Sequence, residues 1–192
     1  MDRLTKLLVR AQGGDREALE SFVGATQGDV WRLCRHLGDL RDADDLTQET
    51  YERAIGSLHR FRADGPARGW LLTIARRVCV DHTRRAVRRR RLDDELRSEI
   101  SATSEGALYR NEDSERVVLD DLLARLDIDR RAAFVLTQVL GLQYDEAAEV
   151  LGCPIGTIRS RVARARLDLI AMASPSEKDL RSTGTDGPLR TT

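Results

Sequence analysis

Apolar residues recur every three or four positions along most of the chain, a pattern typical of amphipathic helices. In the first half this periodicity predicts four helices, over about 4–12, 15–37, 43–58 and 70–91. Gly13-Gly14 and Gly65-Pro66 are turn signals between them, and Asp15 is a suitable N-cap for the second helix. The third helix has an apolar stripe that includes Leu46, Ala54 and Ile55, with acidic residues on its other side.

The periodicity fades after residue 92, where the chain becomes acidic and rich in serine. It returns in apolar stripes and short helical patterns over 117–126, 133–140, 144–151 and 156–171. The last residues, 174–192, are rich in Pro, Gly, Ser and Thr and are typical of a disordered tail. We therefore expect an all-α protein of two small helical domains, 1–92 and 114–173, joined by an acidic linker over 93–113.

The composition agrees with a folded helical protein. Of the 192 residues, 41% are hydrophobic and only 4% aromatic. The longest uncharged run, 132–144, has 13 residues, whereas a membrane-spanning helix needs about 20. The N-terminal segment is charged throughout and lacks the apolar core of a signal peptide. We therefore expect a cytoplasmic protein without a membrane span.

The chemistry-bearing side chains predict no enzyme. Cys34, Cys79 and Cys153 lie far apart, with no C-x-x-C or Cys/His cluster, so they favour small buried residues over a disulfide or zinc site. The acids of the helix over 43–58 lack a nearby His, Ser or Cys for catalysis, and they are too spread for a metal site. No metal or other cofactor is expected, and these acids form either a solvated face or a docking face for a partner.

Positive and negative charge are strongly segregated, although the 32 basic residues balance the 32 acidic ones. The segment 76–91 has eight arginines and one acid, and 155–170 has four arginines and one acid. Acids dominate 39–52 and 92–129. Two basic islands separated by an acidic bridge indicate a protein that touches a polyanion at two places.

The last predicted helices have the spacing of a helix-turn-helix. A small Ala148 allows the helices to cross closely, Gly152 suits a turn with positive φ, and Ile158 packs the second helix onto the first. A purely structural hairpin is the alternative, but it does not explain the polar and basic side chains of the second helix. Those that we expect to contact DNA in the major groove or at its phosphates are Thr157, Arg159, Ser160, Arg161 and Arg164.

Three ordered blocks carry a resemblance to a known family. They are DADDLTQETYERAIGSLHRF, ARGWLLTIARRVCVDHTRR and LLARLDIDRRAAFVLTQVLGLQYDEAAEVLGCPIGTIRSRVARAR. In this order they closely resemble a bacterial sigma factor of the extracytoplasmic-function group, over about residues 1–173. The resemblance implies a subunit that binds core RNA polymerase and directs it to promoter DNA.

The resemblance also implies roles for individual residues. Those matching the block that docks on the coiled coil of the largest polymerase subunit are Asp44, Asp45, Leu46, Gln48 and Glu49. Those inheriting recognition and melting of the minus-ten element are Phe61, Trp70, Thr73, Arg76, Arg77, Asp81, Arg84 and Arg85. The second domain is expected to read the minus-thirty-five element through the helix that begins near residue 156. In the docking block, the family's aromatic position is occupied here by Tyr51. In the minus-ten helix, the family commonly has Asn where this chain has Arg77, so the identity of the flipped minus-ten base is not implied.

Two other classes of function remain as alternatives. A free-standing helix-turn-helix regulator would bind duplex DNA tightly without polymerase, but the stronger basic island then lies in its sensor half. A nucleic-acid enzyme would need a carboxylate-metal or Cys/His-zinc constellation, which the sequence does not contain. The sequence leaves an anti-sigma protein open as a further partner, because such proteins bind the surfaces used for polymerase and leave no separate motif.

Overall fold

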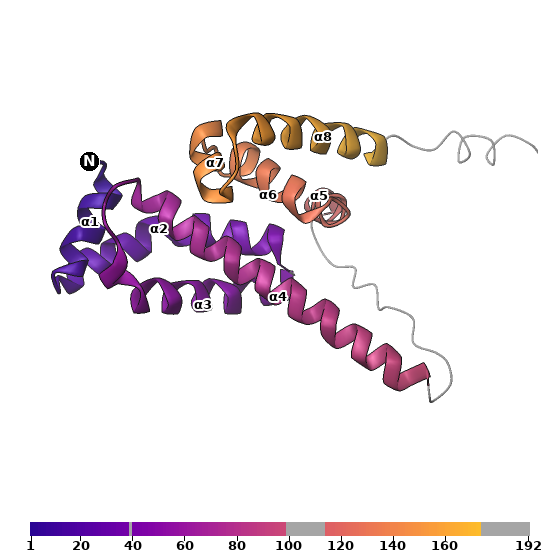
Figure 1. The fold of residues 1–192 in the computed structure, drawn as a ribbon, viewed down its shortest axis with the longest axis horizontal. Coiled ribbons are helices and arrows are strands. Elements are labelled where there is room, and N and C mark those ends of the chain that lie inside the picture. The colour runs from indigo at the N-terminus through magenta and orange to yellow at the C-terminus, as the bar shows by residue number, and fades with distance from the viewer. Residues whose placement is uncertain (39, 99–113, 174–192) are drawn as a thin grey trace, which may run out of the picture.

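The computed structural model describes residues 1–38, 40–98 and 114–173, and every regular element in these ranges is helical. Figure 1 shows the first half as an antiparallel group of long helices and the second half as a smaller group beside it. The helices of the first half are α1 (Arg3–Gln12), α2 (Arg16–Leu37), α3 (Ala43–Gly56) and α4 (Ala67–Ser98). Short 3₁₀ turns, η1 (Leu40–Asp42) and η2 (Leu58–Arg60), flank α3. The second half has α5 (Ser114–Ala124), α6 (Ile128–Phe134), α7 (Tyr144–Leu151) and α8 (Ile155–Ala173), with a π-helical turn, η3 (Val135–Val139), after α6.

Local sequence signals explain several helix ends. The Asp15 carboxylate accepts a hydrogen bond from the backbone N–H of Ala18 at 3.0 Å, which confirms it as the N-cap of α2. Gly152 ends α7 with a φ of 61°, the left-handed conformation expected of the turn before α8. The Asp127 side chain caps α6 by accepting from the N–H of Asp129 and of Arg130. The helix-turn-helix geometry thus follows from residues that are close together in the sequence.

Helix α4 is longer than the periodicity predicts. It continues to Ser98, whereas the linker was expected to begin at residue 93. No glycine or proline occurs between residues 70 and 98, so nothing in the local chain stops the helix where its apolar stripe ends. Most of the expected linker, 99–113, and the expected disordered tail, 174–192, lie outside the described residues.

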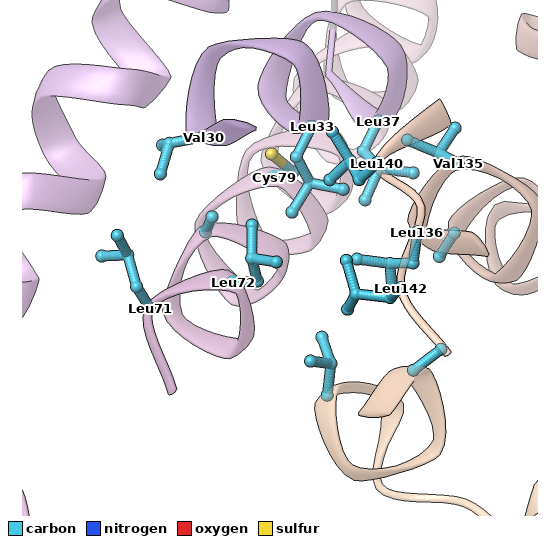
Figure 2. Close-up of a cluster of buried hydrophobic side chains, with 14 of the residues drawn as sticks. Val30, Leu33, Leu37, Leu71, Leu72, Cys79, Val135, Leu136, Leu140 and Leu142 are labelled. Carbon is cyan, nitrogen blue, oxygen red and sulfur yellow. The ribbon is translucent and has the colours of Figure 1, made fainter. Parts of the chain in front are cut away.

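The two halves share one buried apolar cluster. Figure 2 shows side chains of α2 and α4 on one side and the segment around η3 on the other, with Leu140 close to Leu37. Leu33 and Leu72 from the first half, and Leu136 from the second, are at most 1% exposed. A smaller cluster around Leu123, Leu126 and Ala165 is confined to the second half. Burial of apolar surface from both halves therefore stabilises their side-by-side arrangement.

The three cysteines are free. Cys34 and Cys79 are fully buried in the large cluster, as the sequence predicts for small apolar residues, and Cys153 is half-buried in the turn between α7 and α8. The hydrogen bond with Cys34, together with burial, raises the pKa of Cys79. Cys79 is therefore held as a neutral thiol within the core.

Candidate protein and nucleic-acid interfaces

The first candidate interface is the acidic face of α3. Asp44, Asp45 and Gln48 are exposed on it, as predicted, and Glu49 is half-buried. Leu46 is different, because it is 2% exposed and belongs to the core. Leu46 therefore lies in the apolar stripe predicted for this helix and is not available on the acidic face, although the resemblance places it in the docking block. Residues 46, 50 and 54 are one helical turn apart and all face inward, which orients the acids outward.

A groove of about 420 Å³ runs along this acidic face between α2 and α3. Ile55, expected in the core stripe, is instead 48% exposed and lines this groove. Trp31 of α2 closes one side, and its indole Nε1–H donates to the Asp44 carboxylate at 2.8 Å. Val23 and Gln27 complete the α2 wall. The sequence analysis did not single out these α2 residues, although Val23, Gln27 and Trp31 are four positions apart and so share a helix face.

An ion-pair chain joins the acidic helix to α4. The Arg53 guanidinium contacts the carboxylates of Glu49 and of Asp81, the latter at 3.3 Å. Burial opposes the charged form of Arg53, but the hydrogen bonds with both acids outweigh it and raise its pKa. Asp81 was expected to contact minus-ten DNA. Its carboxylate here holds an arginine of α3.

The second candidate interface is a pocket of about 240 Å³ at the start of α4. Phe61 is only 6% exposed and packs against the half-buried Trp70, with ring centroids 5.3 Å apart and planes tilted by 57°. Both rings line the pocket together with Thr73, whose hydroxyl donates to the Gly69 carbonyl within the helix. Aromatic rings of this kind can stack on an unpaired base.

The second domain reaches this pocket. Glu149 and Val150 of α7 form part of its wall. The Val150 side chain lies so close to α4 that a Cβ added at Gly69 would be 3.9 Å from it. A carboxylate at Glu149 is a poor neighbour for a nucleic-acid phosphate.

Further along α4, the predicted DNA-binding arginines are not equivalent. Arg77, Arg84 and Arg85 are exposed, whereas Arg76 is half-buried and faces the second domain. The Arg76 guanidinium lies 3.4 Å from the carboxylate of Asp129 in α6. The exposed arginines can therefore meet phosphates directly, while Arg76 is occupied.

The third candidate interface is the outer face of α8. Arg159, Ser160 and Arg164 are exposed there, and Thr157 is half-buried. The Ser160 hydroxyl donates to the Thr157 carbonyl at 3.0 Å. Arg161 points the other way, and its guanidinium donates to the Asp129 carboxylate at 2.8 Å.

Asp129 is the residue that joins the two DNA-binding candidates, because its two carboxylate oxygens pair with Arg76 of α4 and Arg161 of α8. It is 42% exposed, and its arginine partners are 24% and 23% exposed. Each pair is therefore partly screened by water. No pattern in the sequence indicates this role, since an acid in the first turn of a helix is expected there for local reasons.

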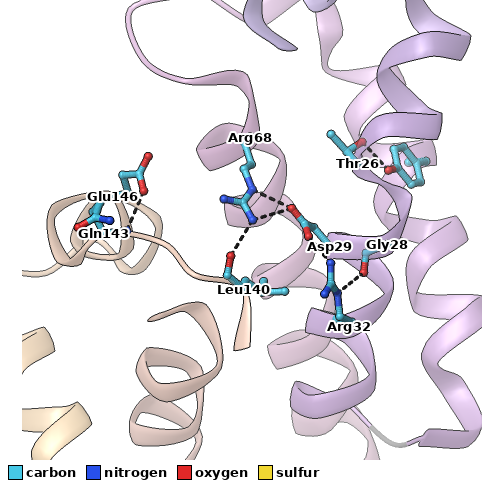
Figure 3. A network of polar contacts seen from close by, with 9 residues as sticks. Thr26, Gly28, Asp29, Arg32, Arg68, Leu140, Gln143 and Glu146 are labelled. Carbon is cyan, nitrogen blue, oxygen red and sulfur yellow. Dashed lines mark hydrogen bonds and ion pairs between the residues drawn. The ribbon is translucent and has the colours of Figure 1, made fainter. Parts of the chain in front are cut away.

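Two further polar contacts connect the halves. The Arg68 guanidinium bonds to the Asp29 carboxylate at 2.8 Å and to the Leu140 carbonyl at 2.8 Å (Figure 3). On the other side of the interface, the Asp120 carboxylate pairs with Arg35 and lies 3.0 Å from the His36 ring. Burial lowers the pKa of His36, although Asp120 acts in the opposite direction.

Within residues 1–38, 40–98 and 114–173, the structure contains no cluster of three or more His, Cys, Asp or Glu side chains that could hold a metal ion. No helix in these ranges is long and apolar enough to cross a membrane. The described residues form an acidic groove on one side of the molecule and a pocket with aromatic and basic lining elsewhere.

Comparisons with known proteins find a family match in each half of the chain. Residues 22–89 match the family "Sigma-70 region 2" and residues 116–169 match "Sigma-70, region 4". The chain is 47% identical over 176 residues to the ECF RNA polymerase sigma factor SigC of Mycobacterium tuberculosis, covering 92% of this chain and 94% of the relative.

Two solved structures are similar over most of their length. CnrH, in complex with the cytosolic domain of CnrY, aligns with a TM-score of 0.69 and 28% identity, over 89% of this chain and 97% of its own. The sigma factor RpoE, in complex with the anti-sigma factor NepR from Bartonella quintana, aligns with a TM-score of 0.60 and 27% identity, over 79% of this chain and 93% of its own.

Proposed function

The chain belongs to the extracytoplasmic-function group of bacterial RNA polymerase sigma factors, and from this premise we propose how its surfaces divide the work. Like its family, it binds core RNA polymerase and directs promoter-specific initiation of transcription. In our proposal, residues 1–92 dock on polymerase and open the minus-ten element, residues 114–173 read the minus-thirty-five element, and residues 93–113 link them.

The groove between α2 and α3 is the proposed docking surface for core polymerase. Asp44, Asp45 and Gln48 supply exposed polar contacts, while Trp31 and Ile55 supply apolar area beside them. A mixed surface with an aromatic anchor is the type that carries most binding energy in protein interfaces. Glu49 supports this surface through its ion pair with Arg53. Leu46 supports it from the core, where its burial orients the acidic face of α3 outward.

The pocket at Phe61 and Trp70 is the proposed place for an unpaired base of the minus-ten element. Thr73 shapes its wall, and Arg77, Arg84 and Arg85 follow on α4 where strand phosphates would pass. Asp81 positions these residues by tying α4 to Arg53. Exposed Arg159, Ser160 and Arg164 on α8 are the proposed contacts to minus-thirty-five DNA, with Thr157 and Arg161 next to them.

The described arrangement is the proposed DNA-free form, and one observation supports this assignment. Asp129 pairs with Arg76 and with Arg161, so one carboxylate neutralises an arginine of each DNA-binding surface. Glu149 also lines the pocket proposed for the base. DNA phosphates and these acids would compete for the same space and charge. Promoter binding therefore requires the two domains to separate, and docking on polymerase would supply the separation.

Transcription in vitro tests the proposal. The purified chain is added to bacterial core polymerase on fragmented genomic DNA, and RNA start sites are mapped. We expect discrete starts that share two short upstream motifs, and little duplex binding by the chain alone. Tight, polymerase-independent binding to a two-fold operator, without any start, would instead indicate a free-standing regulator.

An anti-sigma protein is a further proposed partner. CnrH and RpoE, which are similar to this chain over both domains, were solved with the cytosolic domain of CnrY and with the anti-sigma factor NepR, respectively. A partner of this class would form a one-to-one complex with the chain and would abolish the starts mapped above when added before polymerase. Addition after the holoenzyme has formed should have a smaller effect, because the docking groove is then occupied.

We further propose that the chain acts as an initiation factor in the cytoplasm, where its polymerase partner works, and has no catalytic activity of its own. Its family membership supports both statements. The chemistry of nucleotide addition then belongs to the polymerase. A chain that hydrolysed or deaminated DNA in the absence of polymerase would contradict the second statement.

A further inference from the structure

Helix α1 contacts the segment that forms the pocket at Phe61 and Trp70. Figure 1 shows α1 beside the connection between α3 and α4. The side-chain amide Nε2 of Gln12, the last residue of α1, donates to the Leu58 carbonyl at 3.1 Å and to the Phe61 carbonyl at 3.0 Å. These carbonyls lie 46 and 49 residues further along the chain. One exposed glutamine thus fixes the backbone at which the pocket loop begins.

The same helix also holds the other end of the loop. The Thr5 hydroxyl accepts a hydrogen bond from the backbone N–H of Ala67, the first residue of α4, at 3.0 Å. Thr5 is 2% exposed and Ala67 is fully buried, so this contact is shielded from water. The loop between these two anchors, residues 61–66, provides five of the residues that line the pocket.

The loop needs such anchors because its own conformation is unfavourable. Ala63 has a φ of 56°, a left-handed conformation that costs free energy for a residue with a Cβ. Strained residues persist only where the surrounding structure holds them. The ring of Phe61, at the start of the loop, and that of Trp70, in the first turn of α4, lie 5.3 Å apart, a separation that depends on both ends of the loop staying in place.

We infer that Gln12 and Thr5 are positioning residues for promoter opening, which set the shape of the pocket without touching DNA. Both precede residues 22–89, the span that matches sigma-70 region 2. The inference rests on the proposed role of this pocket in holding a minus-ten base. Gln12 carries it furthest, because its side chain is exposed and lies outside the apolar core, so its substitution leaves the core intact.

The test compares variants by promoter discrimination. Holoenzyme transcribes the strongest promoter found by start-site mapping. It also transcribes versions of that promoter in which each base of the minus-ten element is changed singly. Discrimination at a position is the ratio of the transcription rate with the best base to that with a substitute. We expect Gln12→Leu to lower this ratio by about three- to tenfold at one or two positions, the size of effect that the loss of one or two hydrogen bonds produces. Gln12→Glu, which presents a negative oxygen to two carbonyls, should narrow it more. Affinity for core polymerase should stay within experimental error, and the melting temperature should fall by no more than a few degrees.

Matched variants separate positioning from folding. Lys6→Ala alters an exposed residue of the same helix and should leave discrimination unchanged. Thr5→Val removes the hydroxyl that Ala67 needs, whereas Thr5→Ser keeps it, so only the serine variant should retain discrimination. If Thr5→Val fails to fold, the Gln12 variants still decide the outcome.

Direct changes to the pocket distinguish two kinds of failure. Trp70→Leu should lose discrimination at the same positions as Gln12→Leu. If Trp70→Leu loses discrimination and neither Gln12 variant does, the positioning role is overturned and the proposed pocket stands. If Trp70→Leu retains full discrimination, the pocket does not hold a minus-ten base, and both the proposed function of the pocket and the role of Gln12 fall.

Discussion

The proposed docking groove and the proposed DNA-binding surfaces of this sigma factor differ in how accessible they are. The groove between α2 and α3 is open, with Asp44 and Gln48 exposed along it. The proposed DNA-binding surfaces are partly engaged by the protein itself, because Asp129 pairs with Arg76 and Arg161. In our proposal the chain can therefore bind polymerase in the described arrangement, whereas it must rearrange to bind a promoter.

This difference gives an order to assembly. A site that is available in only a fraction of molecules binds its ligand more weakly by that fraction. Two modest DNA surfaces also gain affinity together only when their separation fits the promoter. Polymerase binding through the open groove, followed by separation of the domains, satisfies both requirements. Free sigma factor is then kept from occupying DNA without polymerase.

The largest effect should come from disrupting the apolar contact between the two domains. Leu140→Asp places a charge at a residue that is 6% exposed in the shared cluster. We expect the described arrangement, in which the two domains pack together and which is here called the closed form, to lose stability on the order of 3 kcal/mol relative to the separated one. Small-angle X-ray scattering should show a larger radius of gyration for the free protein, and duplex DNA carrying the minus-thirty-five element should bind more tightly.

The control for this experiment is a substitution in the second cluster. Leu126→Ala weakens packing within the second domain, where Leu126 contacts a group separate from the shared cluster. It should lower the melting temperature without changing the radius of gyration at 25 °C. A folded Leu140→Asp protein with the radius of the parent would contradict the role of this contact.

The next largest effect should come from the open groove. Asp44→Arg reverses an exposed charge that lines the groove of the proposed docking surface. A central interface residue commonly contributes about 2 kcal/mol, so affinity for core polymerase should fall about 30-fold. Glu20→Arg reverses an exposed charge of α2 outside the groove and should change affinity by less than about twofold. Fluorescence anisotropy of labelled chain with core polymerase measures both.

Much of the fold follows from local sequence signals. The helices, the Asp15 cap and the left-handed Gly152 are determined by residues within one or two turns of each other. The acidic side of α3 was also predictable. Its phase was not fully so, because Leu46 turns inward and Ile55 outward, although both are apolar. An apolar residue that lines a binding groove has the same sequence signal as one in the core.

The contact between the DNA-binding surfaces was not predictable in the same way. Arg76 and Asp129 are 53 residues apart, and Asp129 and Arg161 are 32 apart. They meet only because the two domains pack together, and no periodicity encodes that packing. Charge segregation predicted two places where a polyanion could bind. It could not indicate that an acid of the bridge between the basic islands would pair with both.

A smaller effect is expected from removing this acid. Asp129→Asn leaves Arg76 and Arg161 without their shared carboxylate. Both pairs are partly exposed, so together they stabilise the closed form by about 1 kcal/mol at low salt. The free protein should then bind minus-thirty-five duplex about fivefold more tightly in an electrophoretic assay. Asp121→Asn, which breaks only the local pair with Arg125, should leave binding unchanged. Equal binding by both variants would show that Asp129 does not restrain the arginines.

The smallest effect should come from protonation of His36. In the closed form, burial lowers the pKa of His36 from its ordinary value of 6.5. The positive charges of Arg35 and Arg32 lower it further, and the opposing effect of Asp120 does not offset them. The separated form exposes this face and returns the pKa toward its ordinary value. The closed form thus binds fewer protons, and its stability is complete above pH 6.5 and declines as the pH falls below it.

Energy transfer between dyes on the two domains should therefore decrease slightly on going from pH 7.5 to 5.5. His36→Gln should remove that dependence, whereas His82→Gln, a change within the first domain beside Asp42, should keep it. If His36→Gln retains the full pH dependence of energy transfer, other groups cause that dependence. The contact between the domains would then be insensitive to His36.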